Sequence, residues 1–181
     1  MRPTRFSASL AIVLGLITAP ASLDAQTCTA NGAPANCSST GSVTMTAGRV
    51  VLLQVSAAST TLTPPTPTDF DNGFNATTGP TLTVSANAPW TLYLRASSAL
   101  WTATNTSPGA PARTNKPAGD LKWSKVSGGP FSGLTTTDVN LVNGTATASS
   151  VTSLYFQTLY NWTLDTPGNY SLSVVLTLTS P

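Results

Sequence analysis

The aspartates are the side chains of this sequence that are best suited to catalysis or metal binding. The chain contains no His and no Glu, so the side chains that most often transfer protons are missing. Two carboxylates placed together can cleave a glycosidic bond, and Asp69 and Asp71 alternate along the chain. They lie in a turn-type segment, however, where carboxylates commonly accept hydrogen bonds from backbone N–H groups. We therefore assign no catalytic residue and expect a protein that is not an enzyme.

The same two aspartates also suggest a calcium site. The run Asp69-x-Asp71-Asn-Gly73 places oxygen ligands in a turn, which is the arrangement that Ca²⁺ prefers. An EF-hand loop has its Gly one position later and ends on a Glu, and this run has neither feature. Two interpretations stay open: Ca²⁺ bound at Asp69 and Asp71, or a turn closed by side-chain hydrogen bonds. We expect no other cofactor, and the lack of His argues against zinc.

Cys28 and Cys37 are the two cysteines of the chain. They follow what reads as an export signal, and outside the cytoplasm a disulfide is the expected state. Closing a ring of about ten residues contributes roughly 2.7 kcal/mol in the loop-entropy model. The predicted disulfide staples residues 26–41 into a local loop and leaves no thiol to act as a nucleophile.

The tryptophans raise the possibility of carbohydrate binding, because exposed aromatic faces stack on sugar rings. Trp90 shares one face of an alternating segment with Leu92 and Leu94, so we expect it in the core, where large aromatics usually lie. Trp101 lies at the edge of a loop and is the best candidate for an exposed, ligand-binding aromatic. A carbohydrate-binding module that uses Trp101 and neighbouring aromatics is therefore the alternative function.

Residues 1–25 have the features of a secretory signal peptide. Arg2 and Arg5 form a positive region, an apolar stretch covers residues 10–17, and small residues over 21–25 suit cleavage before Gln26. The apolar stretch is shorter than the ~20 residues of a membrane span. We expect a mature protein without a membrane span that is secreted, periplasmic or located at the cell surface.

The composition favours a β-rich globular domain. Hydrophobic residues make up 40% of the chain and charged residues 8%, a balance that argues against disorder. Thr and Ser fill many polar positions; β-branched Thr suits a strand, and the scarcity of Lys and Glu disfavours helices. The net charge of +2 and the scattered basic residues give no surface typical of nucleic-acid binding.

Short segments with strand character follow one another from residue 42 onward. Val50–Val55 is a dense apolar run, expected as a central strand with both faces covered. Asn143-Gly144 is a strong hairpin signal between two short strands. The other expected strands are Ser42–Thr46, Thr81–Ser85, Trp90–Arg95, Leu121–Val126, Leu154–Trp162 and Tyr170–Thr179. The pattern predicts an all-β fold: a single antiparallel, Ig-like β-sandwich of about eight strands over residues 42–181, with a barrel as the alternative.

The C-terminal segment shows the alternation most clearly. Leu172, Val174, Leu176 and Leu178 alternate with mostly Ser and Thr, as expected for a strand with one buried face. No charged residue follows Asp165, and a long uncharged edge strand would invite association. We therefore predict that this strand is interior to a sheet and pairs with Leu154–Trp162 through a turn at residues 166–169.

Two segments resemble a known group of proteins. Asp165-Thr-Pro-Gly-Asn-Tyr170 leads into the alternating terminal strand, and Leu82-Thr-Val-Ser-Ala-Asn-Ala-Pro-Trp90 connects two strands. Both resemble bacterial secreted Ig-like and fimbrial domains of the spore-coat-U and pilin type. The resemblance implies a β-sandwich with a structural or adhesive surface role. Donor-strand assembly in such proteins uses an alternating N-terminal extension, a pattern that residues 26–41 do not have.

These observations predict an exported, non-enzymatic structural or cell-surface protein, with a fimbrial, adhesive or filament subunit as its most specific version. Like subunits or cell-surface glycans are the expected partners. No nucleic acid is expected among them.

Overall fold

The computed structural model describes residues 29–33, 36–38, 42–106 and 109–181. The chain divides into two units, Met1–Thr46 and Ala47–Pro181. The described residues of the first unit form no helix or strand, so the short strand expected over Ser42–Thr46 is wrong for the isolated chain. The predicted signal peptide lies outside the described residues. None of the described helices is long and apolar enough to cross a membrane.

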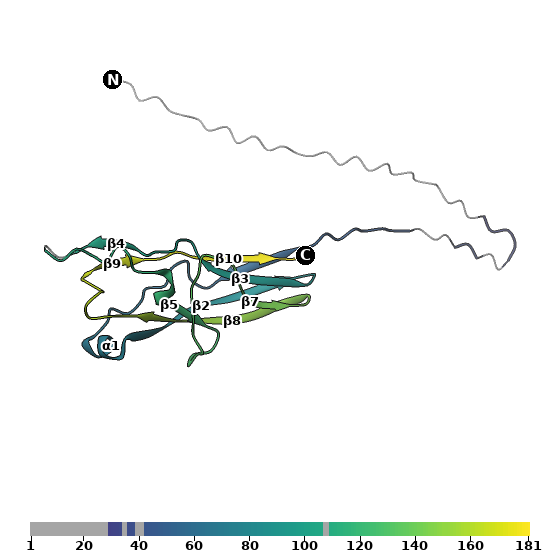
Figure 1. Ribbon diagram of the computed structural model, residues 1–181. Coiled ribbons are helices and arrows are strands. Elements are labelled where there is room, and N and C mark those ends of the chain that lie inside the picture. The colour runs from purple at the N-terminus through teal and green to yellow at the C-terminus, as the bar shows by residue number, and fades with distance from the viewer. Residues whose placement is uncertain (1–28, 34–35, 39–41, 107–108) are drawn as a thin grey trace, which may run out of the picture. The chain divides into compact units, whose positions relative to one another are not determined.

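The described residues of the second unit form ten strands and two short helical segments (Figure 1). In chain order they are β1 (Val51–Val55), α1 (Pro67–Asn72), β2 (Phe74–Ala86), β3 (Trp90–Ala96), β4 (Thr102–Asn105), the 3-10 turn η1 (Ala118–Asp120), β5 (Leu121–Ser124), β6 (Ser132–Gly133), β7 (Val139–Gly144), β8 (Thr147–Leu159), β9 (Gly168–Ser171) and β10 (Val174–Thr179). They form a five-stranded sheet of order β1-β2-β8-β5-β6, a three-stranded sheet of order β10-β3-β7, and the pair β4-β9. Every strand pair is antiparallel. The predicted all-β class is confirmed.

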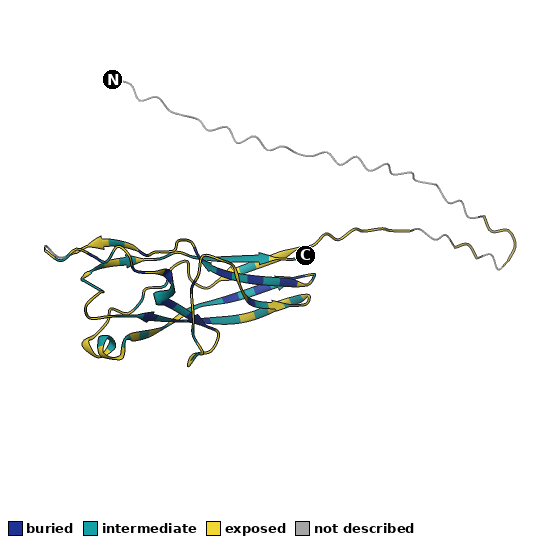
Figure 2. Cartoon of the chain, in the orientation of Figure 1, coloured by how far each residue is buried: buried dark blue, intermediate teal, exposed yellow. Residues whose placement is uncertain are grey.

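The two larger sheets bury their inner faces against each other, which makes the fold a sandwich (Figure 2). The five-stranded sheet contributes Leu82, Val84, Trp123, Leu154 and Phe156, and the three-stranded sheet contributes Trp90, Leu92, Leu94 and Leu141. Alternation along β2 and β3 produces this core, because every second side chain of a strand points to the same face. The predicted core position of Trp90 is confirmed, since its side chain is buried together with Leu92 and Leu94.

The Asn143-Gly144 pair does not form the expected hairpin. β7 runs through both residues and pairs with β3, whereas β8 pairs with β2 and β5 in the other sheet. The indole of Trp90 lies against Gly144, where an added Cβ would be 2.8 Å from the ring. Its Nε1 donates a 2.9 Å hydrogen bond to the carbonyl of Thr145. The glycine therefore serves the close approach of Trp90 and not a two-residue turn.

Helix α1 replaces the turn expected around Asp69. Thr66 and Asp69 form a reciprocal capping box, in which each side chain accepts a hydrogen bond from the other residue's backbone N–H. Pro67 occupies the first turn, where its missing N–H costs nothing. Gly73 ends the helix with φ of +79°, a conformation that favours glycine.

A buried ionic cluster joins the loop before η1 to the turn before β9. Its members are Arg113, Lys116, Asp120 and Asp165, in which each cation lies within 3.4 Å of both carboxylates. Lys116 also donates a 2.8 Å hydrogen bond to the carbonyl of Leu159. Buried charges are tolerated when they are paired and hydrogen-bonded in this way.

Tyr170 fixes the same turn from the side of β9. Its hydroxyl donates to the carbonyl of Thr166 at 2.7 Å and accepts from the backbone N–H of Arg113 at 2.9 Å. This is the hydrogen-bond pattern of a tyrosine corner, in which a Tyr side chain closes the connection that precedes its own strand.

Candidate functional site

The C-terminal segment is divided between two sheets. β9 pairs with β4, and after Leu172 and Ser173 the chain continues as β10, which pairs with β3 from Val174↔Ala96 to Thr179↔Thr91. The predicted neighbour, Leu154–Trp162, is wrong, because that stretch lies in β8 of the other sheet. The tyrosine corner explains the difference, since it directs the chain after Thr166 toward β4 and the three-stranded sheet.

β10 is also an edge strand and not an interior one, so the prediction of an interior position is wrong. It occupies one end of the order β10-β3-β7. The alternating side chains Leu172, Val174, Leu176 and Leu178 do pack against the core, as expected, but they are only partly buried. Period-2 alternation identifies the face that a strand buries and carries no information on whether both of its edges are paired.

β1 is the corresponding edge of the five-stranded sheet. It pairs with β2 alone, so the expectation of a central strand with both faces covered is wrong. Leu53 faces the core, whereas Val51, Leu52 and Val55 are exposed. Asn87 fixes the entry to the strand, because its side chain accepts from the N–H of Val50 and donates to the carbonyl of Gly48.

β1 and β10 lie next to one another, and we call the two together the open edge. Natural proteins protect exposed strand edges with Lys, Pro, bulges or very short strands. Neither Val51–Val55 nor Val174–Thr179 contains a charged residue or a proline, and both pair with their neighbours without a register shift. By contrast, β6 has two residues and β7 pairs with β3 through an irregular register.

The core is incompletely covered at the open edge. Leu82, Leu92 and their neighbours in interior strands are fully buried. The inward side chains of the two edge strands remain partly exposed, namely Leu53, Val174, Leu176 and Leu178. An added strand there would pair its backbone and cover apolar surface, which is the mode of recognition known as β-augmentation.

An apolar segment that alternates like a strand lies in Met1–Thr46. Val43 and Met45 are 98% and 88% exposed; Thr44 separates them, and Ser42 and Thr46 flank them. The alternation that predicts a strand here is present, but the chain by itself supplies no partner strand for it in the described structure.

Trp101, the tryptophan expected to be exposed, is buried. Its side chain is 5% exposed and belongs to the core, and its Nε1 donates to the carbonyl of Pro117 at 3.1 Å. Backbone hydrogen bonds between Trp101 and Lys116 and between Ala118 and Ala99 draw the following loop across it. The expected exposure of Trp101 is therefore wrong, and a buried indole presents no face to a sugar.

Asp69 and Asp71 serve different partners and do not share a site. Asp69 caps α1 and accepts from Asn75 Nδ2 at 3.2 Å. Hydrogen bonds from the backbone and then the side chain of Thr66 hold the pKa of Asp69 below its usual value of 3.8. Asp71 Oδ1 accepts from Trp162 Nε1. Across the described part of the chain, no three acidic, Cys or His side chains gather as a metal site, and calcium at Asp69 and Asp71 stays a prediction.

Only one cysteine of the predicted disulfide lies in the described residues. Cys28 lies outside the described residues, while Cys37 is described and is not a free cysteine. The pairing of Cys28 with Cys37 therefore stays a prediction.

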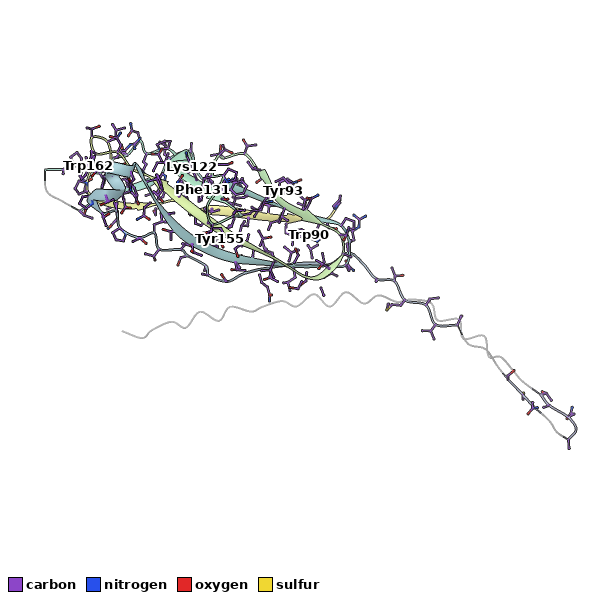
Figure 3. All side chains as sticks on the ribbon, turned by 90° about the horizontal axis from the view of Figure 1, so that it is seen from below. Trp90, Tyr93, Lys122, Phe131, Tyr155 and Trp162 are labelled. Atoms are coloured by element: carbon purple, nitrogen blue, oxygen red, sulfur yellow. The ribbon has the colours of Figure 1, made fainter. Side chains whose placement is uncertain are left out.

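Trp162 is the exposed tryptophan that sequence reasoning missed. It follows the end of β8 and lies at one end of the sandwich (Figure 3). Its side chain is 58% exposed and stacks on Phe70. Extending the alternation of Leu154, Phe156 and Thr158 would place Trp162 on the core face. The strand ends at Leu159 instead, and the Asn161-Trp162-Thr163 turn sends the indole outward. The turn-forming Asn161, whose side chain accepts from Thr163, was the available signal.

Comparison with known proteins does not assign this chain to a family. No family model matches the chain, and no curated protein matches it significantly.

Proposed function

We propose that this protein is an exported, non-enzymatic structural subunit of the cell surface that associates with copies of itself through the open edge. The observation that carries the proposal is the combination of an unprotected edge and a partly covered core at β1 and β10. A monomer that only needed to stay soluble would be expected to protect such an edge.

The strand that fits this edge is Ser42–Thr46 of a second copy. Val43 and Met45 would cover Leu176, Leu178 and the other inward side chains of the edge strands, while the backbone pairs with β10. Five extended residues span about 17 Å, which is close to the length of either edge strand. Ser, Thr and apolar residues at this contact add no charge that pairing would have to desolvate.

The aspartates of the described residues support a non-enzymatic role, because each of them is engaged in a structural interaction. Asp69 caps α1, Asp71 accepts a hydrogen bond from an indole, and Asp138 forms an ion pair with Arg95. Asp120 and Asp165 belong to the ionic cluster. A carboxylate that must take up or release protons is better placed facing a substrate than bound to fixed structural partners.

Two complementary variants test the association. Val43→Asp/Met45→Asp disables the donor segment but leaves the edge intact, whereas Thr177→Lys charges the middle of β10 but leaves the donor segment intact. Sedimentation velocity should show concentration-dependent oligomers for the exported wild-type protein and monomers for each variant alone. A mixture of the two variants should form one-to-one dimers, because one copy still donates and the other still accepts.

Val126→Asp is the matched control, since Val126 is exposed but lies outside the open edge. This variant should assemble like the wild type. Wild-type protein that stays monomeric at every concentration, or oligomers that survive in both single variants, would exclude association by this route.

A further inference from the structure

A second surface feature lies at the α1 end of the sandwich and has no part in the open edge. Phe70, Tyr160 and Trp162 form an aromatic cluster there, and Trp162 lies at the opposite end of the sandwich from Trp90 (Figure 3). Phe70 and Trp162 stack with ring centroids 4.6 Å apart and an interplanar angle of 26°. Tyr160 packs against Phe70 at 5.4 Å. With Trp162 58% exposed, the indole presents a large flat surface to solvent.

The indole is held in a fixed orientation. Its Nε1 donates a 2.9 Å hydrogen bond to Asp71 Oδ1, across 91 positions of the chain. Asp71 belongs to the capped helix α1. The turn that carries Trp162 is also held in place, because Asp165 Oδ2 accepts a hydrogen bond from the N–H of Asn161 at 2.9 Å. A contact surface that is rigid before binding loses less conformational freedom when a ligand arrives.

We propose that this cluster binds a neutral polysaccharide built of glucose-type pyranose rings. A β-linked glucose ring carries its substituents equatorially, so its C–H faces are flat and match an exposed indole. Ring hydroxyl groups at the edge of the stack are donors, and the Asp71 carboxylate beside the indole is an acceptor for them. The proposal concerns a ligand site and goes beyond the association at the open edge.

Charge disfavours an anionic ligand at this surface. Asp71 and Asp69 both lie on α1 beside the stack, and the nearby cation Lys116 is buried and already paired with Asp165. An acidic polysaccharide or a phosphate would meet like charge there. A neutral sugar chain meets hydrogen-bond acceptors and an apolar face, and sugars with an axial hydroxyl fit the flat indole less well.

Calorimetric titration of the exported protein with cellohexaose, a soluble β-1,4-linked glucose hexamer, tests the site. Trp162→Ala should weaken binding about tenfold or more, as expected when a central aromatic anchor is removed. Asp71→Ala should also weaken it, because it frees the indole. Val126→Ala is the control, since Val126 is likewise 58% exposed and lies elsewhere. Mannohexaose, whose rings carry an axial hydroxyl, should bind more weakly than cellohexaose.

A measurement on the wild type needs no variant. Trp90, Trp101 and Trp123 are buried, so acrylamide quenching of tryptophan fluorescence reports mainly on Trp162. Cellohexaose should protect the fluorescence from quenching. The absence of protection, unchanged affinity in Trp162→Ala, or protection by a proline-rich peptide but not by the hexamer would overturn the proposal. Failure of the open-edge experiment would leave this result unaffected, because the two sites share no residue.

Discussion

Lys116 Nζ lies 2.9 Å from Asp165 Oδ1, and both side chains are almost fully buried. The pair joins a loop residue to a turn residue 49 positions later in the chain. Asp165 also accepts from the backbone of Asn161, next to Trp162. The ionic cluster therefore supports the turn that carries the proposed sugar-binding surface.

Removal of Asp165 is expected to destabilise the fold strongly. Asp165→Ala leaves the buried Lys116 and the partly buried Arg113 with Asp120 as their remaining carboxylate, and breaking a buried ion pair in this way typically costs about 3 kcal/mol or more. Asp138→Ala removes the partner of Arg95 in an exposed pair, for which a loss of about 0–1 kcal/mol is expected. Urea denaturation compares the two variants. Equal losses in the free energy of unfolding would show that burial of the cluster does not determine how much it stabilises the fold.

The sequence is sufficient to predict the fold class and much of the core but not the strand partners. Trp90, Leu92 and Leu94 lie where the alternation places them, because period 2 alone decides which side chains share a face. The partner of a strand depends on how its connection turns. The turn before β9 is set by Tyr170, Thr166 and the backbone of Arg113, and the last of these is distant in sequence.

Local sequence patterns likewise do not predict which aromatic side chains are exposed. Trp101 is covered by a later loop, which is held by backbone hydrogen bonds from Trp101 to Lys116 and from Ala118 to Ala99, and no local pattern encodes that cover. Helix α1, in contrast, had readable signals: Thr66 three residues before Asp69, Pro67 in the first turn and Gly73 after the end. A helix of six residues is too short to show helical periodicity, so its caps were the available evidence.

Gly79→Ala is expected to strain the pairing of β2 with β8. An added Cβ would lie 2.6 Å from the ring of Phe156 and 3.1 Å from the carbonyl of Leu154, and overpacking of this kind costs about 1–3 kcal/mol. Gly48→Ala is the control, because nothing lies within 4 Å of its added Cβ. Thermal denaturation followed by circular dichroism should show a lower Tm for Gly79→Ala alone. An unchanged Tm would mean that Phe156 can move aside freely.

Tyr170→Phe should loosen the turn before β9. The substitution removes the hydroxyl that bridges Thr166 and Arg113 and leaves a partly buried carbonyl and N–H without this partner. Such a loss typically costs about 1–3 kcal/mol. Tyr93→Phe is the matched control in β3, because no hydrogen bond of its hydroxyl is part of this turn. Chemical denaturation should rank the two variants, and equal stability would show that the corner is dispensable.

The cap of α1 should respond to acid in a defined direction. Hydrogen bonds from the backbone and then the side chain of Thr66 lower the pKa of Asp69 below 3.8. The charged form is thus favoured in the folded state, so its contribution to stability is present above about pH 4 and is lost as pH falls through the folded pKa. An NMR titration of Asp69 should show its pKa rising toward 3.8 in Thr66→Val. Thr68→Val, two residues further along, should leave the pKa of Asp69 unchanged. A higher pKa of Asp69 in both variants would point to a general loss of the helix.

Amide hydrogen exchange should distinguish the open edge from the interior strands. In an antiparallel edge strand, alternate N–H groups bond to the neighbour while the others point outward. β10 has β3 on one side, whereas β2 is paired with both β1 and β8. Under conditions that keep the protein monomeric, the outward amides of β10 should exchange rapidly, and association through the edge should protect them while leaving β2 unchanged. Protection that instead appears in β6 or β7 would place the contact between subunits on a different edge of the sandwich.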